Sequence, residues 1–220
     1  MNNKSNTVRY RSKVLSRVLL VTRYSLLVTL ASCAPDKPGN VQPSLDDRSS
    51  GDTAVQSQSR RGSIYDINMT FENQDAQWVA WQSLKGKAQV MAMIFTHCQA
   101  SCPMITHEIK DAENLVPASL KNRVGYTLIS FDTKRDTAAR LKSHYDTMHL
   151  DPSWQLLHGS AEDIQTIASL LDVKFKKMAS GDFSHSNVII VVDASGHIVW
   201  RREGIERNPG EIASKIESLF

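Results

Sequence analysis

Nearly continuous apolar runs mark three segments of the chain, and amphipathic segments lie between and after them. Residues 88–95, 124–131 and 187–192 carry few polar side chains, which is typical of strands covered on both faces of a sheet. The segments in which helices are expected are 103–115, 137–148, 160–171 and 209–220. This order of strands and helices predicts an α/β domain with a central mixed sheet and helices on both faces.

Shorter apolar segments are expected to extend this sheet at its edges. At the N-terminal side, residues 64–71 and 77–81 predict a β-hairpin extension with a turn near Asn73. Two further short strands are predicted at 154–157 and 197–202, and the second is expected to pair with the last core strand across a turn.

Two of the predicted helices begin beside residues that suit helix capping. Asp136 precedes the segment 137–148, and its carboxylate is expected to accept a hydrogen bond from the first turn. Ser160 opens the segment 160–171 and is expected to cap it, with Asp163 at the third position.

The first 33 residues have the composition of a targeting segment. A basic region ends at Arg23, the apolar run 24–30 follows, and small residues precede Cys33, which predicts a secretory signal. The run is shorter than the ~20 residues that span a bilayer. Residues 30–33 (Leu-Ala-Ser-Cys) resemble the lipobox of bacterial lipoproteins, which implies cleavage before Cys33 and a lipid on its thiol. A mitochondrial presequence is the first alternative, and a free structural Cys33 is the second.

Residues 34–62 differ from both neighbouring segments in composition. They are rich in Pro, Ser, Asp, Gln and Gly and carry few large apolar side chains. Such a segment cannot bury enough apolar surface to offset the entropy lost on ordering. We therefore expect a flexible tether between the signal, residues 1–33, and one domain at residues 63–220.

Composition and charge exclude several classes of protein. The 220 residues are 41% hydrophobic and 22% charged, which is ordinary for a globular domain, and three cysteines are too few for a disulfide scaffold. Six of the 26 basic residues, and no acidic residue, fall in the first 33 positions. The remaining 20 basic residues face 23 acidic ones, so the body of the chain gives no reason to expect a nucleic-acid partner.

One pair of cysteines stands where chemistry is expected. Cys98 and Cys102 lie four positions apart, between the end of a core strand and the start of a helix. Unpaired N–H groups at a helix N-terminus favour the thiolate, which is the form that binds soft metals and attacks disulfides. The alternative is an inert disulfide, but so short a loop constrains the unfolded chain little.

Two thiolates leave a metal site incomplete, and histidine is the natural third ligand. His97 precedes Cys98 directly, so strand alternation is expected to turn its ring away from the thiol. His185 lies in the segment 181–187, a predicted loop that enters a core strand and can lie beside Cys98 in a doubly wound sheet. A set of two cysteines and one histidine suits Cu(I), Cu(II) or zinc. The histidines read as ordinary surface or loop residues are His107, His144, His149, His158 and His197.

Four blocks of the sequence follow one another along the chain: Gly86-Lys87 with the motif Phe95-Thr96-His97-Cys98-x-x-x-Cys102-Pro103, Phe131-Asp132-x-x-Arg135-Asp136-Thr137, Trp154 with Gly159, and His185-Ser186 with Asp193-x-x-Gly196. In these blocks and in their order the chain resembles the Sco/SenC family of copper-handling, thioredoxin-like proteins that assist cytochrome c oxidase assembly. The resemblance spans about residues 64–204, and Gln99 departs from it, because many members carry proline after the first cysteine.

The resemblance implies both a fold and a set of site residues. It implies that residues 63–220 form a thioredoxin-like domain in which Cys98, Cys102 and His185 bind copper as Cu(I) or Cu(II). The two cysteines are also expected to be a redox pair, with a disulfide in the metal-free state and reduced thiols with Cu(I). Asp132, after the second core strand, is interpreted as an acceptor that supports the site, as a partner-docking residue or as a strand-end cap.

Two functions follow from the resemblance. The first is a copper metallochaperone, whose expected partners are the copper-bearing subunit of the oxidase, a copper donor, a thiol reductant protein and, through the lipid anchor, a membrane. The second is a thiol–disulfide oxidoreductase that reduces the cysteines of that subunit or acts in redox defence. His185 favours copper, because disulfide exchange needs no third ligand. A zinc-stabilised binding module is the weakest reading, because no fourth ligand is evident. The expected location is the periplasmic side of a bacterial cell envelope, with the mitochondrial inner membrane as the alternative.

Overall fold

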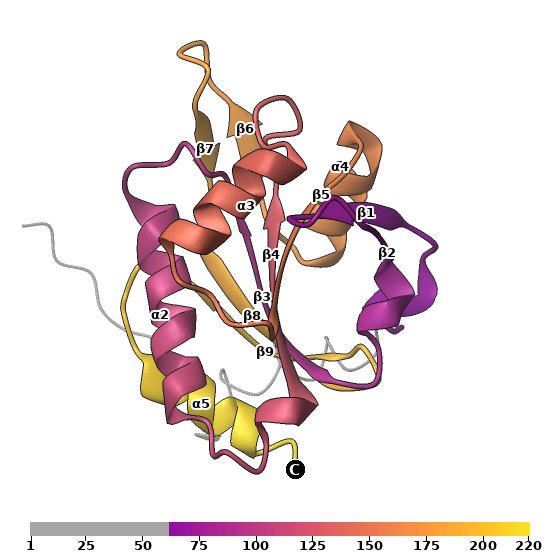
Figure 1. Cartoon of the computed structure of the whole chain (residues 1–220), viewed down its shortest axis with the longest axis vertical. Helices are drawn as coiled ribbons and strands as arrows, with labels where there is room; N and C mark the ends of the chain where they lie inside the picture. Colours follow the sequence, from indigo (N-terminus) through magenta and orange to yellow (C-terminus); the bar gives the residue numbers. More distant parts are fainter. Residues whose placement is uncertain (1–61) are drawn as a thin grey trace, which may run out of the picture. The chain divides into compact units, whose positions relative to one another are not determined.

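The computed structural model describes residues 62–220 (Figure 1). The predicted signal, Cys33 and the predicted tether up to residue 61 therefore lie outside the described residues. Between residues 62 and 220, no helix combines the length and the apolar character needed to cross a membrane.

A seven-stranded mixed sheet forms the centre of the domain, in the order β2-β1-β5-β4-β3-β8-β9. Strand β4 is parallel to both β3 and β5, whereas β8 is antiparallel to β3. Every residue of β3, β4 and β8 is buried, as the apolar runs predict. The bounds of these five strands are β3 (Ala88–Ile94), β4 (Val124–Ser130), β5 (Trp154–His158), β8 (Val188–Val192) and β9 (Ile198–Glu203).

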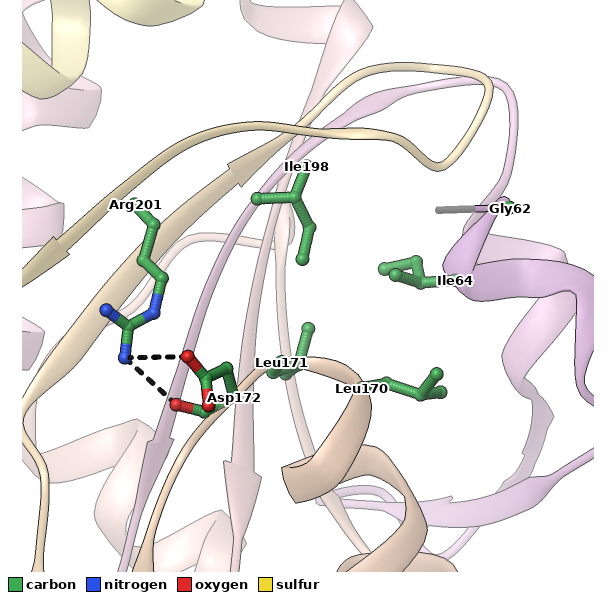
Figure 2. Close-up of a pocket in the computed structure, with 7 residues that line it drawn as sticks. All are labelled: Gly62, Ile64, Leu170, Leu171, Asp172, Ile198 and Arg201. Carbon is green, nitrogen blue, oxygen red and sulfur yellow. Dashed lines mark hydrogen bonds and ion pairs between the residues drawn. The ribbon is translucent and has the colours of Figure 1, made fainter. Parts of the chain in front are cut away.

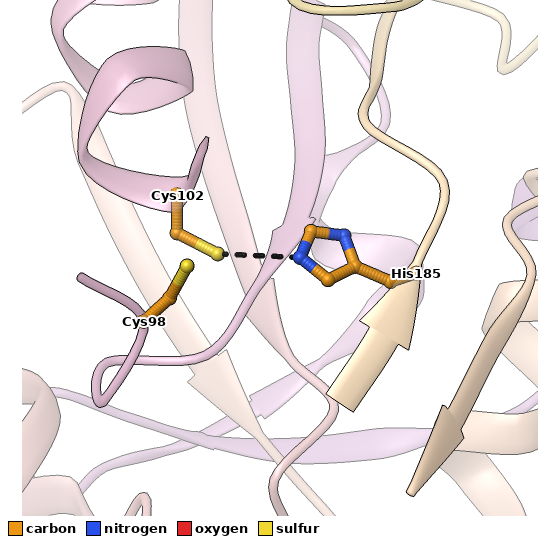
Figure 3. A group of neighbouring side chains, drawn as sticks. All are labelled: Cys98, Cys102 and His185. Atoms are coloured by element: carbon orange, nitrogen blue, oxygen red, sulfur yellow. Dashed lines mark hydrogen bonds between the residues drawn. The ribbon is translucent and has the colours of Figure 1, made fainter. Parts of the chain in front are cut away.

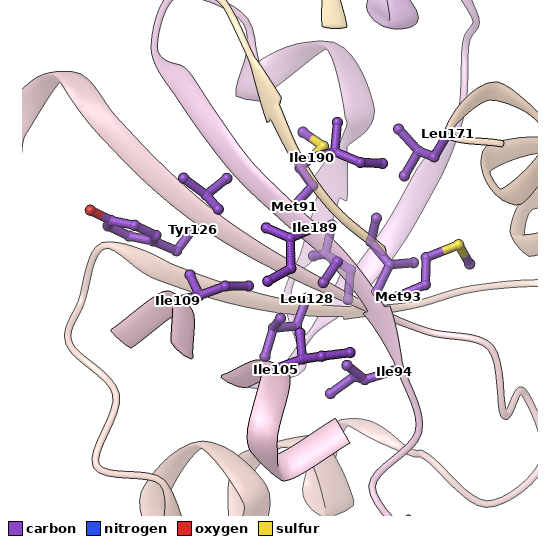
Figure 4. Packing of buried hydrophobic residues seen from close by; sticks show 14 of the residues in the cluster. Met91, Met93, Ile94, Ile105, Ile109, Tyr126, Leu128, Leu171, Ile189 and Ile190 are labelled. Carbon is purple, nitrogen blue, oxygen red and sulfur yellow. The ribbon is translucent and has the colours of Figure 1, made fainter. Parts of the chain in front are cut away.

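Four helices cover the sheet, and Figure 1 shows α2, α3 and α5 on one side and α4 on the other. Figure 4 shows the apolar contacts that result: Ile105 and Ile109 of α2 lie beside Leu128 and Ile94, whereas Met91 and Ile190 lie on the opposite face of the sheet, toward Leu171. The helices are α2 (Ser101–Leu115), α3 (Ala138–Thr147), α4 (Ala161–Leu170) and α5 (Pro209–Glu217). The predicted mixed sheet with helices on both faces is confirmed.

The N-terminal hairpin is shorter than predicted. The expected first strand begins with a 3₁₀ turn, Ile64–Asp66, and pairing is confined to β1 (Thr70–Asn73) and β2 (Trp78–Ala80). This 3₁₀ turn is fixed to the domain by a hydrogen bond, because the indole N–H of Trp81 donates to the carbonyl oxygen of Ile64 at 2.8 Å. Two more 3₁₀ turns are Trp81–Leu84 and Lys121–Arg123.

One predicted helix cap is correct and the other is wrong. The Ser160 hydroxyl accepts from the backbone N–H of Asp163 at 3.0 Å, as expected. Helix α3, however, is capped by Thr137, whose hydroxyl accepts from the N–H of Arg140. The Asp136 carboxylate is buried instead, because donors from Thr96 and from Ser130 hold it inside the domain.

A second hairpin stands where the sequence predicted only a loop. Strands β6 (Phe175–Lys177) and β7 (Phe183–His185) pair antiparallel as a separate two-stranded sheet. Each strand has only three residues, and Lys176, Lys177 and Ser184 interrupt its apolar pattern, so the segment carries no clear strand signal. The hairpin carries His185, one of the residues predicted to bind a metal.

Candidate metal centre

The two cysteines are brought together by the turn from β3 into α2. The strand ends at Ile94, the backbone N–H of Cys98 donates to the carbonyl oxygen of Phe95, and α2 begins at Ser101. Cys98 therefore sits in the loop and Cys102 in the first helical turn. Both are free thiols; Cys98 is half-buried and Cys102 is fully buried. Their predicted place at the strand end and helix start is confirmed.

His185 reaches this pair from the hairpin of β6 and β7 (Figure 3). Its Nε2 lies 3.8 Å from the Cys102 sulfur and 3.5 Å from the Ser101 hydroxyl. The two sulfurs and one imidazole nitrogen all lie within 4.8 Å of one another. The sequence placed His185 beside the cysteines in a loop; the placement is right, although the residue belongs to a strand.

The tautomer of His185 leaves the correct nitrogen free. Its Nδ1 lies 3.2 Å from the carbonyl oxygen of Ser186, so Nδ1–H donates there and the Nε2 lone pair faces the thiols. Burial lowers the pKa of His185, although the contact with Ser186 acts in the opposite direction. The lowered pKa favours the neutral imidazole, which is the form that binds a metal.

The donor set fits a soft metal ion. Two thiolates and one neutral imidazole suit Cu(I), and the imidazole allows the same ligands to accept Cu(II). Because Cys98 and His185 are only partly buried, the ligands remain accessible to a partner protein. The residues present therefore fit copper better than a permanently enclosed structural metal, which takes four protein ligands.

The two thiols differ in acidity. Burial alone raises the pKa of Cys98, but the backbone N–H groups of Cys102 and Ala100, together with the Ser101 hydroxyl, outweigh it and lower the pKa below its usual value. Burial raises the pKa of the Cys102 thiol strongly, and the neighbouring Cys98 adds to this shift. Cys98 is thus the thiol that ionises first and meets an incoming ion or disulfide.

Iodoacetamide should modify Cys98 well before Cys102 in the reduced, metal-free protein. Because the pKa of Cys98 is lowered, its labelling should begin at a lower pH than that of an ordinary thiol, whereas Cys102 should resist until the solution is strongly alkaline or the protein unfolds. Mass spectrometry of the labelled peptides over a pH series measures both rates. Equal labelling of the two cysteines at neutral pH would contradict this assignment.

Aromatic side chains form the apolar wall behind His185. The ring centroid of His185 lies 5.0 Å from that of Phe131 and 5.9 Å from that of Phe95. Phe175 and Phe183, on the two strands of the hairpin, pack at 5.2 Å and 5.0 Å from Phe131. These contacts hold the hairpin against the end of β3 and β4, beside the cysteines.

Neither His97 nor Asp132 makes a hydrogen bond with the three candidate ligands in the described part of the chain. The Nδ1 of His97 lies 3.5 Å from the Asp136 carboxylate, and His97 is not part of the group of Cys98, Cys102 and His185; it lies in the loop after β3, so the strand alternation expected there does not apply. Asp132 is buried and paired with Arg135, and its backbone carbonyl accepts N–H groups from Arg135 and Asp136. The sequence assigns no role to Ser101, and it marks Arg135 only as part of a family-like block, because the contacts of both residues are with distant parts of the chain.

A second group of potential ligands, His97, Asp132 and Asp136, also has its ligand atoms within 4.8 Å of one another, but it contains no thiol and does not suit a soft metal. Among residues 62–220, the five remaining histidines join no group of three or more potential metal ligands. A small cavity of about 40 Å³ is lined by Ile64, Leu171, Ile198 and their neighbours (Figure 2). Arg201 donates there to the carbonyl oxygen of Asp172 at 2.9 Å. No thiol or imidazole lines this cavity, so it is not a site for a soft metal.

A family model decides the identity of the domain. The SCO1/SenC model matches residues 57–220. The chain belongs to the SCO1/SenC family. The region matched contains all three residues of the Cys98, Cys102 and His185 cluster, and the family agrees with the resemblance predicted from the sequence motifs.

Solved structures of SCO1/SenC proteins share this fold. Bradyrhizobium japonicum ScoI, solved with copper bound, is 26% identical, with a TM-score of 0.61 over 70% of this chain and 98% of that one. A SCO1/SenC family lipoprotein from Bacillus anthracis is 26% identical, with a TM-score of 0.64 over 70% and 93%. BsSco, described as a Sco-family cytochrome c oxidase assembly protein with a disulfide switch, is 27% identical, with a TM-score of 0.61 over 70% and 91%. The predicted thioredoxin-like fold is confirmed.

Proposed function

We propose that this SCO1/SenC protein is a copper metallochaperone that holds copper through Cys98, Cys102 and His185 and delivers it to the copper-bearing subunit of cytochrome c oxidase. The observation that carries the proposal is the convergence of two thiols and a correctly oriented imidazole from distant parts of the chain. The copper-bound relative from Bradyrhizobium japonicum supports copper as the cargo. The description of BsSco supports the oxidase as the destination.

The chain's own residues suggest an order for loading and release. Cys98 is accessible and ionises most readily, so its thiolate receives the ion first. Cys102 then loses its proton as the metal binds, and His185 adds the third donor without releasing one. Release runs in the opposite direction, because thiolates of a partner can replace the accessible ligands one at a time while the buried Cys102 still holds the ion.

A second function is favoured by the unequal acidity of the two thiols. The Cys98 thiolate can attack one sulfur of a partner's disulfide, and the other partner sulfur leaves as a thiolate. Cys102 then attacks the Cys98 sulfur, which releases the second partner thiol and leaves a Cys98–Cys102 disulfide. The protein ends oxidised, so this activity needs a thiol reductant protein to restore it. The disulfide switch described for BsSco supports this alternative.

A transfer experiment distinguishes the two functions. The Cu(I)-loaded protein is mixed with a reduced, copper-free oxidase copper domain, and copper is measured in each after separation. The chaperone function predicts that copper moves to the oxidase domain. Retention of all copper by this protein, combined with fast reduction of the oxidised oxidase domain by the metal-free dithiol form, would instead favour the oxidoreductase.

We also propose that Cys33 carries the lipid that anchors the protein on the periplasmic side of a bacterial membrane. The lipobox-like residues 30–33 and the lipoprotein relative from Bacillus anthracis support this location. Cys33→Ser should shift most of the protein from the membrane fraction to the soluble fraction, or stall its processing. Cell fractionation with immunodetection measures the change. Unchanged membrane retention with normal cleavage would reject the lipid anchor.

A further inference from the structure

Beyond its chain connections to α4 and to β8, the hairpin that carries His185 contacts the domain mainly through side chains. Strands β6 and β7 pair with each other and are not part of the seven-stranded sheet. Phe175 and Phe183 pack the hairpin against Phe131, and Phe183 also lies 5.4 Å from Phe95. Because hydrophobic contacts are non-directional, this cluster favours contact without fixing the angle of the hairpin. A directional contact is needed to hold His185 in one place.

Arg135 supplies a directional contact at the tip of the hairpin. It lies in the loop between β4 and α3, and its Nη2 donates to the carbonyl oxygen of Gly181 at 3.0 Å. Its Nε donates at the same time to the carboxylate of Asp132. A guanidinium can serve both acceptors because its N–H groups diverge in a rigid plane, whereas a lysine ammonium cannot reproduce this fork.

The backbone of Asp132 is held in place by hydrogen bonds to its neighbours. Its backbone N–H donates to the Ser130 hydroxyl at 3.1 Å, and its carbonyl oxygen accepts from the backbone of Arg135 and Asp136. The side chain of Asp132 is only 1% exposed, and its Oδ1 has no hydrogen-bond partner in the described region. A continuous series of hydrogen bonds, from β4 through Asp132 and Arg135 to Gly181, therefore links the main sheet to the hairpin.

We propose that Arg135 is a positioning residue for the third copper ligand. Its bridge from Asp132 to Gly181 keeps the hairpin at the angle that places Nε2 of His185 within reach of the Cys102 sulfur. The inference rests on the proposed copper function and deepens it. Without the bridge, the hairpin moves on its aromatic base, and the fraction of molecules with His185 in place falls. The affinity for a copper ion that needs all three ligands falls in proportion to the fraction of molecules that still have His185 in place.

Arg135→Ala in the full chain tests the proposal with two measurements. In the metal-free protein, amide hydrogen exchange should become faster in residues 175–185 and stay unchanged in β3, β4 and α2. Cu(II) affinity, measured by competition with a chelator, should fall by about tenfold, the range expected for loss of a residue that supports a ligand. Cu(I) affinity should change by less than about threefold, because the two thiolates still hold that ion.

Two further variants make the result specific. Lys134→Ala removes the adjacent positive charge but no hydrogen bond found among the described residues. Its hydrogen exchange in residues 175–185 and its Cu(II) affinity should therefore equal those of the parent. Arg135→Lys keeps the charge without the fork and should resemble Arg135→Ala; it also carries the test if Arg135→Ala fails to fold. Parent-like hydrogen exchange and Cu(II) affinity in both Arg135 variants would overturn the proposal, and so would equal losses in Lys134→Ala.

The same experiment separates this inference from the proposed function. If the parent and every variant bind no copper, the copper function fails, and hydrogen exchange in the metal-free protein still decides whether Arg135 holds the hairpin. If the parent binds Cu(II) and the Arg135 variants bind it equally well, the copper function survives and the positioning role is overturned.

Discussion

Replacing Cys102 with serine is expected to abolish stable copper binding in both oxidation states. The Cys102 sulfur is the buried donor of the cluster, 3.8 Å from Nε2 of His185, and a hydroxyl is neither deprotonated at neutral pH nor soft enough to replace it. The loss should exceed about a hundredfold, the upper range for loss of a residue that only supports a ligand. Chelator competition and the copper content after gel filtration measure the effect.

Cys98→Ser is the matched control for the effect of the mutation on folding. Cys98 is half-buried, so serine there should lose copper equally while leaving the free energy of unfolding close to that of the parent. Cys102→Ser buries a hydroxyl in an apolar position and should cost about 1–3 kcal/mol. Loss of copper in both variants, with destabilisation in only one, identifies ligand loss as the cause. A Cys98→Ser protein that keeps copper like the parent would contradict the ligand assignment.

Replacing His185 with alanine is expected to weaken Cu(II) binding more than Cu(I) binding. Two thiolates can hold Cu(I) in a linear arrangement, but stable Cu(II) binding needs a further donor. The charge-transfer absorption band of the Cu(II)–thiolate bond should therefore fade or change shape in the variant. Disulfide exchange by Cys98 and Cys102 should remain, because neither step of that reaction uses the imidazole.

His97→Ala is the matched histidine control for this experiment. The His97 ring pairs with the buried carboxylate of Asp136, so its removal should affect Cu(II) binding far less. If both histidine variants bind Cu(II) like the parent, His185 is not a ligand and the oxidoreductase function becomes the better one. If His97→Ala alone abolishes binding, the ligand set proposed for this site is wrong.

The central strands could be predicted because burial on both faces leaves a clear pattern. Residues 88–95, 124–131 and 187–192 are nearly all apolar, and the strands β3, β4 and β8 lie within those limits. The hairpin of β6 and β7 could not be predicted in this way. Its strands are short and half-exposed, and its stability comes from the packing of Phe175 and Phe183 on Phe131, a contact between residues more than 40 positions apart.

The candidate site shows the same division between local and distant information. The cysteine pair follows from local spacing, since the turn into α2 brings residues four apart together. His185 was singled out by its position before a core strand and by the family resemblance, and only the fold brings it to the cysteines. The prediction that Asp136 caps a helix is wrong because its carboxylate bonds to Thr96, 40 positions away, and the neighbouring sequence carries no sign of that contact.

X-ray absorption spectroscopy at the copper edge tests the central claim most directly. The full chain is loaded with one equivalent of Cu(II), and the number and kind of atoms around the metal are determined for the parent and for His185→Ala. The proposed site predicts two sulfur neighbours and one imidazole nitrogen in the parent, with the imidazole contribution lost in the variant. A spectrum dominated by nitrogen and oxygen with no sulfur neighbour, or an unchanged imidazole contribution in His185→Ala, would contradict the proposed copper site.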